Sequence, residues 1–129
     1  MLELVQPMES ETLQRMLRYG LATAMERIHL RPGHRPLAEG LGGPRELGYR
    51  QLSGDDTSAV AGHFLAAAQV SERLRESSAD AAREVFLFME LRGGGLAEAS
   101  FEVCRGGLAV TIELFQPLPR GQAAEVLEP

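Results

Sequence analysis

The segment ASFEVCRGGLAVTIEL, residues 99–114, decides the fold that we expect for the second half of this chain. Apolar and polar residues alternate on both sides of the two glycines, and this period of two is typical of half-buried β-strands. A three-residue loop would turn the two apolar sets to opposite faces of the sheet, which is costly. We therefore predict a two-residue turn at Gly106 and Gly107, which pairs Val103 with Val110 and brings the apolar sets together on one face.

Two further elements complete the predicted core. The apolar run at residues 84–91 ends at three glycines and predicts another strand. Residues 56–76 predict a helix, because the hydroxyl and carboxylate groups between Ser53 and Asp56 can cap its first amides. Short connections favour an antiparallel meander of three or four strands with this helix packed across it. The expected fold class is α+β, with an additional amphipathic helix at the N-terminus.

The first half of the chain is expected to consist of one helix and a linker. Apolar residues recur every three or four positions between Ser10 and Leu30, which predicts an amphipathic helix with Ser10 as its N-cap. Glycine and proline are frequent in the following segment, which therefore reads as a linker or an irregular loop. The expected organisation is an N-terminal helix at 1–30, a linker at 31–54, and a helix with an antiparallel sheet at 55–129.

The composition excludes several classes of function. The chain has 129 residues and a net charge of −5, and all 13 of its basic residues are arginine. Without lysine there is no Walker-type phosphate loop and no Schiff base, and the acidic balance argues against nucleic-acid binding. One cysteine favours a reducing compartment. No apolar run is long enough for insertion into a membrane, which needs roughly 18 residues.

The histidines, the cysteine, the glycine run and the acidic pair do not have the spacing of a metal-binding, phosphate-binding or catalytic motif. The possible metal ligands do not have the spacing of a known metal site; they are His29, His34, His63 and Cys104. The glycines at 93–95 join two strands and do not open a helix, as a phosphate-binding loop would. Asp55 and Asp56 stand where acidic residues cap a helix. We therefore expect no catalytic residue, no metal and no cofactor.

The order of elements from residue 85 to residue 128 carries a family resemblance. An apolar strand is followed by a loop that ends in Gly95-Leu96, a strand at 99–103, and the segment Gly107-Leu108-Ala109-Val110. This order resembles the C-terminal substrate-specificity-switch domain of flagellar hook-length control proteins and injectisome needle-length regulators. The resemblance covers a little over half of the chain. Ala97 departs from it, because the family usually has a glycine there, and the family's long ruler segment is absent.

The resemblance implies a non-enzymatic component of a type III secretion system. Such a protein would bind the cytoplasmic domain of the export gate's switch protein and regulate substrate specificity or needle length. It would be cytoplasmic, and its own export through the apparatus is left open. The expected partner-binding surface is the outer sheet face with the adjoining loop, which contribute Phe86, Phe88, Arg92, Leu96 and Glu98. The alternative is a small acidic secretion chaperone or adaptor that forms a dimer and binds an effector.

Overall fold

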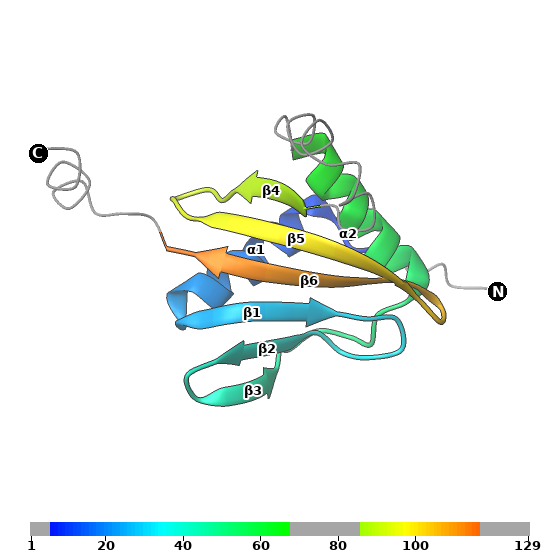
Figure 1. Cartoon of the computed structure of the whole chain (residues 1–129), viewed down its shortest axis with the longest axis horizontal. Coiled ribbons are helices and arrows are strands. Elements are labelled where there is room, and N and C mark those ends of the chain that lie inside the picture. Colours follow the sequence, from blue (N-terminus) through cyan, green and yellow to red (C-terminus); the bar gives the residue numbers. More distant parts are fainter. Residues whose placement is uncertain (1–5, 68–85, 117–129) are drawn as a thin grey trace, which may run out of the picture.

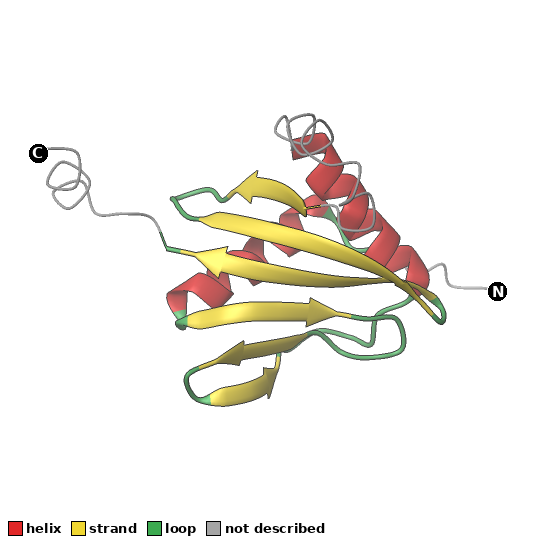
Figure 2. Cartoon of the chain, viewed as in Figure 1, coloured by secondary structure: helices red, strands yellow, loops and turns green. Residues whose placement is uncertain are grey.

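Two helices pack against one face of a six-stranded antiparallel sheet in the computed structural model, which describes residues 6–67 and 86–116 (Figures 1 and 2). The elements are α1 (Ser10–Ala22), β1 (Met25–Leu30), β2 (Leu37–Gly40), β3 (Gly43–Glu46), α2 (Gly54–Ala67), β4 (Phe86–Glu90), β5 (Leu96–Cys104) and β6 (Gly107–Phe115). The strand order is β3-β2-β1-β6-β5-β4. The first and last strands of the sequence therefore pair at the centre of the sheet and join its two halves. The α+β class is confirmed, with more strands than the three or four predicted.

The helix predicted over residues 10–30 is correct only as far as Ala22. Ala24 has a φ of 60°, which reverses the chain, and Met25–Leu30 then form β1. The prediction failed because Met25 and Ile28 are three residues apart, a spacing that fits a helical face as well as a strand with a bulge. The helix begins at Ser10 itself, with Glu9 at the N-cap position and no side-chain cap.

The segment interpreted as a linker, residues 31–54, contains the hairpin of β2 and β3. Gly43 adopts a φ of 90°, which permits the sharp reversal between these two short strands. Pro44 lies in β3, at the edge of the sheet, where a missing backbone N–H removes no ladder hydrogen bond from a central strand. Glycine and proline in this segment therefore mark a hairpin and an edge strand.

The turn between β5 and β6 lies one residue before the predicted one, which shifts the strand register by two residues. Cys104 pairs with Gly107, so the turn residues are Arg105 and Gly106, and Val103 lies opposite Leu108. The apolar sets still share one face, because a shift of two residues preserves side-chain parity. Gly106 has a φ of 93° and meets the turn's need for a residue with positive φ.

The core lies between the sheet and the two helices. Ile28, Val110 and Ile112 of the central strands are fully buried, as are Val60 and Phe64 of α2. The predicted cap of α2 is confirmed: the Asp56 N–H donates to Ser53 Oγ at 3.1 Å, and the Ser53 N–H donates to Asp56 Oδ2 at 2.8 Å. The part of the predicted helix beyond Ala67, and the first two residues of the strand predicted at 84–91, lie outside the described residues.

Candidate functional site

The side of the sheet that faces away from α1 and α2 carries most of the residues of interest (Figure 2). We call this side the open face. Strand pairing arranges its side chains in two rows that cross the sheet. The first row is Phe86, Ser100, Thr111, His29, Leu37 and Glu46. The second row is Phe88, Glu98, Glu113, Arg27 and Glu39.

Four of the five predicted partner-binding residues share the open face. Phe86, Phe88, Leu96 and Glu98 alternate with buried core residues on β4 and β5, and all four are half-buried. Arg92 does not join them. It lies in the loop between β4 and β5, and its guanidinium forms an ion pair with a glutamate of α1 on the other side of the sheet. Phe86 and Phe88 thus lie on the outer sheet face and Arg92 in the adjoining loop, as expected, and their binding of a partner stays a prediction.

The second row concentrates negative charge. Glu98 lies directly opposite Glu113 on the neighbouring strand. Burial raises the pKa of the Glu98 carboxyl, and the charge of Glu113 raises it further. Arg27 is the only cation of this row and donates from Nη2 to Glu113 Oε1 at 3.2 Å, while its Nη1 lies 3.9 Å from Glu39 Oε1. Arg27 thus contacts two of the three carboxylates of this row, those of Glu39 and Glu113.

The first row has an imidazole at its centre. His29 Nε2 is hydrogen-bonded to the carboxylate of Glu39, and this bond, together with the charge of Arg27, lowers the pKa of Glu39. His29 Nδ1 is buried and has no hydrogen-bond partner among the described residues. Buried nitrogen atoms usually have a partner, so this atom is an exception among the described residues.

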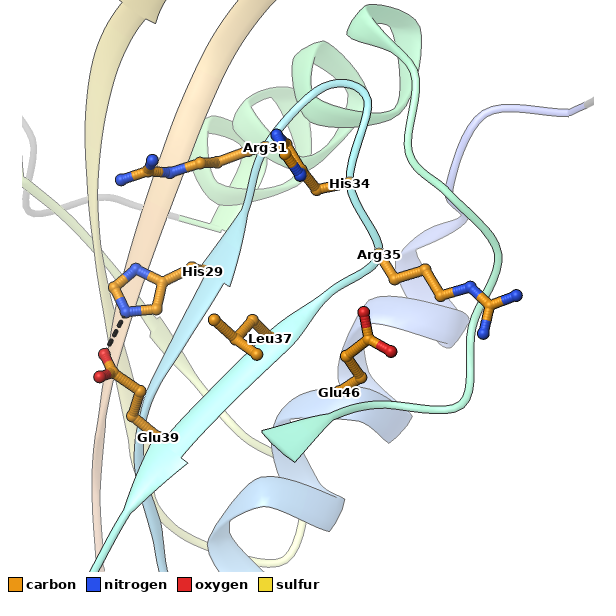
Figure 3. A pocket seen from close by; sticks show the side chains of 7 residues that line it. All are labelled: His29, Arg31, His34, Arg35, Leu37, Glu39 and Glu46. Carbon is orange, nitrogen blue, oxygen red and sulfur yellow. Dashed lines mark hydrogen bonds and ion pairs between the residues drawn. The ribbon is translucent and has the colours of Figure 1, made fainter. Parts of the chain in front are cut away.

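Two cavities adjoin on the open face. The first, of about 340 Å³, lies over β1, β2 and the loop between them (Figure 3). Its lining is His29, Arg31, His34, Arg35, Leu37, Glu39 and Glu46. The second, of about 370 Å³, lies over β4, β5 and β6 and includes Phe86, Ser100 and Thr111. Arg31 lines both cavities and therefore lies between them.

The half of this site on β1 to β3 was missed from the sequence. His29 was counted as a possible metal ligand, and Arg31, Leu37 and Glu39 fell in the segment interpreted as a linker. A signal was present: from Arg27 to Arg31, polar and apolar residues alternate strictly, as they do in a strand with one buried face.

Other groups that often carry chemistry have structural roles here. His63 is hydrogen-bonded to the carbonyl oxygen of Met8 at 2.8 Å, and Asp56 caps α2. Across residues 6–67 and 86–116, no group of three His, Cys, Asp or Glu side chains is placed to hold a metal ion. Within the same ranges, neither helix has the length and apolar character to cross a membrane. The open face offers arginines, carboxylates, an imidazole, two hydroxyls and apolar side chains.

No protein-family model and no curated protein matches this chain. Solved structures do resemble it. The pilus retraction motor PilT with bound ADP aligns with a TM-score of 0.59 and 20% identity over 84% of this chain and 29% of that one. The ATPase DotB of Legionella pneumophila aligns with a TM-score of 0.59 and 16% identity over 98% of this chain and 37% of that one. The ATPase DotB of Yersinia pseudotuberculosis aligns with a TM-score of 0.57 and 18% identity over 93% of this chain and 34% of that one. The chain thus spans about a third of each of these proteins and shares the fold of that part.

Proposed function

We propose that this chain is a non-enzymatic, protein-binding component of a bacterial secretion apparatus, and that it binds its partner through the open face. The observation that carries the proposal is the placement of Phe86 and Phe88. These two aromatic side chains are half-buried on a largely polar face, and Phe88 lies opposite Glu98, whose charge no described arginine neutralises. Aromatic residues surrounded by polar groups are typical of the energetic centre of a protein interface.

The fold comparison relates the chain to part of a pilus retraction motor and of an ATPase. Nearly the whole chain aligns with about a third of PilT and of DotB, which are described as a motor and as ATPases. ATP hydrolysis is not proposed for this chain. It corresponds in length to only part of those proteins, and its sequence has no lysine with which to build a Walker-type phosphate loop.

The resemblance of residues 85–128 to the switch domain names the first partner to test, the cytoplasmic domain of the export gate's switch protein. Regulation of substrate specificity would then follow from binding one state of the gate more tightly than the other, because only differential affinity shifts such an equilibrium. A second candidate partner to test is the ATPase DotB, part of which has the fold of this chain.

A pull-down with the immobilised full chain tests both partners. Phe86→Glu and Phe88→Glu place a charge at the centre of the proposed interface and are expected to weaken binding by at least about tenfold. The matched control is Tyr19→Glu, which changes an aromatic residue that is 50% exposed on α1. Circular dichroism confirms that each variant is folded. Unchanged binding by both phenylalanine variants contradicts the proposal, and a stable homodimer that co-purifies with an effector favours the chaperone alternative.

A further inference from the structure

We propose that this chain forms a two-fold symmetric homodimer in which β4 pairs antiparallel with β4 of a second copy, with the axis at Phe88. The inference goes beyond the proposed function and does not depend on it. Three observations carry it: the backbone groups that β4 directs outward from the sheet, the lack of protection along this strand, and a strand sequence that is complementary to itself.

A hydrogen bond in the loop after β4 fixes which backbone groups of this strand face outward. The Leu91 N–H donates to the carbonyl oxygen of Gly95 at 3.0 Å. Along an antiparallel pair, residues bonded in this way alternate with residues whose N–H and C=O groups point away from the partner strand. Every second residue back from Leu91 therefore bonds to β5. The residues of opposite parity direct their backbone groups outward; they are Phe86, Phe88 and Glu90.

These backbone groups lie at one edge of the sheet, because no strand of the described residues pairs with β4 on its other side (Figure 1). Backbone N–H and C=O groups need a hydrogen-bond partner, which is water or another strand. An edge that presents them in a regular row is a template for a further strand, and natural proteins usually block such an edge.

The opposite edge, β3, is blocked in this way. The Leu47 N–H donates to the carbonyl oxygen of Pro36 at 2.9 Å, so by the same alternation Pro44 and Glu46 face outward. Pro44 has no N–H, and a strand added there would lose a hydrogen bond. In contrast, β4 has no proline and no basic residue, and it pairs with β5 over five consecutive residues without a bulge. The free edge of β4 is therefore the one suited to strand addition.

The sequence of β4 favours a second copy of the same strand as the occupant. A two-fold axis at Phe88 places this residue opposite its own counterpart and Phe86 opposite Glu90 of the second copy. All the outward-facing residues are then opposed, and each opposed pair can exchange two hydrogen bonds. Any shift of this register leaves at least one of them without an opposite residue in β4. We call this β4–β4 pair the seam.

The side chains suit the same register. On the side of the helices, Leu87 lies opposite Met89 of the second copy, which continues the apolar layer across the seam. On the open face, Phe86 and Phe88 of both copies come together, and aromatic pairs across strands are favourable. Each Glu90 lies opposite Phe86 and not opposite the other Glu90. The seam therefore opposes no like charges, although each chain carries a net charge of −5.

The seam joins two sheets into one and places the two open faces side by side. It is short, because β4 has five residues. Such a contact lies at the low end of interface sizes, and we expect a dissociation constant on the order of 10–100 µM.

Sedimentation equilibrium of the full chain, between about 5 and about 500 µM, measures the association. The average mass should rise from 14.0 kDa towards twice that value. Glu90→Pro removes an outward N–H and no hydrogen bond between β4 and β5, so it should weaken the dimer at least about tenfold. The matched control is Glu90→Ala, which removes the side chain and keeps the N–H, and it should associate at least as tightly as wild type. Circular dichroism checks that both variants are folded.

Oxidative cross-linking tests the position of the axis. In a Cys104→Ser background, which removes the single native cysteine, Phe88→Cys places two thiols at the axis. Their Cα atoms would lie about 5.5 Å apart, within the range of a disulfide. The matched Phe86→Cys places the two Cα atoms more than about 12 Å apart and should not cross-link.

Three results would overturn the inference: a chain that stays monomeric over the whole concentration range, a dimer that Glu90→Pro leaves unchanged, or equal cross-linking at positions 86 and 88. A homodimer without a bound effector does not favour the chaperone alternative. The proposed function is therefore tested by the pull-down alone, and the two proposals can fail separately.

Discussion

Arg50 donates from Nη2 to the Oδ1 atom of Asp56 at 2.7 Å, and this pair ties the chain before α1 to the segment that leads from β3 into α2. The Met8 N–H donates to the same carboxylate at 2.9 Å, and Arg50 Nη2 also donates to the carbonyl oxygen of Gln6 at 2.6 Å. The chain before α1, the loop after β3 and the start of α2 therefore meet at one buried carboxylate. The pair fixes the helical layer beneath the sheet.

Asp56→Asn is expected to lower the free energy of unfolding by about 3 kcal/mol, because it leaves the Arg50 cation without its buried counter-charge. The Asp56 side chain is only 1% exposed, so water does not reach the position of the carboxylate, although the Arg50 side chain is 34% exposed and is solvated in part. The midpoint of urea denaturation at pH 7 measures the change. Asp55→Asn, at the exposed neighbouring position, is the control and should cost less than about 1 kcal/mol. Equal losses in the two variants would contradict a central role for the pair.

The Asp56 carboxylate should make the stability of the protein sensitive to acid. Burial by itself raises the pKa of Asp56, but the hydrogen bonds from Arg50 and Ser53 outweigh it, and the pKa is lowered overall. A lowered pKa in the folded state gives stability that is complete above the unfolded value of about 3.9 and is lost as the pH falls through the folded value. The stability difference between wild type and Asp56→Asn should therefore shrink below about pH 4. A difference that stays constant down to pH 2 would refute this assignment.

The elements that could be predicted are those with an unambiguous local signal. Ser53 and Asp56 form the predicted reciprocal cap, and the residues on either side of Gly106 alternate as strands. The exact turn could not be predicted, because registers that differ by two residues place the same side chains on the same face. The choice between them depends on the backbone at Arg105 and Gly106.

The position of β1, and with it that of His29 on the open face, could not be predicted from the sequence. Met25 and Ile28 satisfy a helical and a strand pattern equally well, and the break lies at Ala24, a residue that rarely adopts a positive φ. The pairing of β1 with β6 joins residues more than 80 positions apart, and no local pattern reports such a contact. The sequence alone therefore could not predict that His29 lies beside Thr111.

A pair of glycines in α2 tests the docking of this helix against the turn between β5 and β6. A Cβ atom on Gly54 would lie 2.3 Å from the carbonyl oxygen of Gly106, a backbone atom that cannot move aside alone. Gly54→Ala should therefore destabilise the protein by about 1–3 kcal/mol. A Cβ atom on Gly62 meets nothing within 4 Å, and Gly62→Ala should stabilise the helix by about 0.5–1 kcal/mol. Thermal unfolding measures both variants, and destabilisation by Gly62→Ala or tolerance of Gly54→Ala would show that α2 docks differently.

Glu98→Gln should stabilise the protein at pH 7, because it removes one of two carboxylates that lie directly opposite each other. Burial and the charge of Glu113 raise the pKa of Glu98. A raised carboxyl pKa gives stability that is complete below the unfolded value of about 4.3 and is lost as the pH rises through the folded value. The gain should be about 0.5 kcal/mol at pH 7 and should vanish near pH 4, where the wild-type carboxyl is protonated in both states. Glu102→Gln is the control, since Glu102 is exposed and lies opposite Ala109. A gain of equal size at both pH values would show that packing, and not charge, sets the cost of Glu98 on this face.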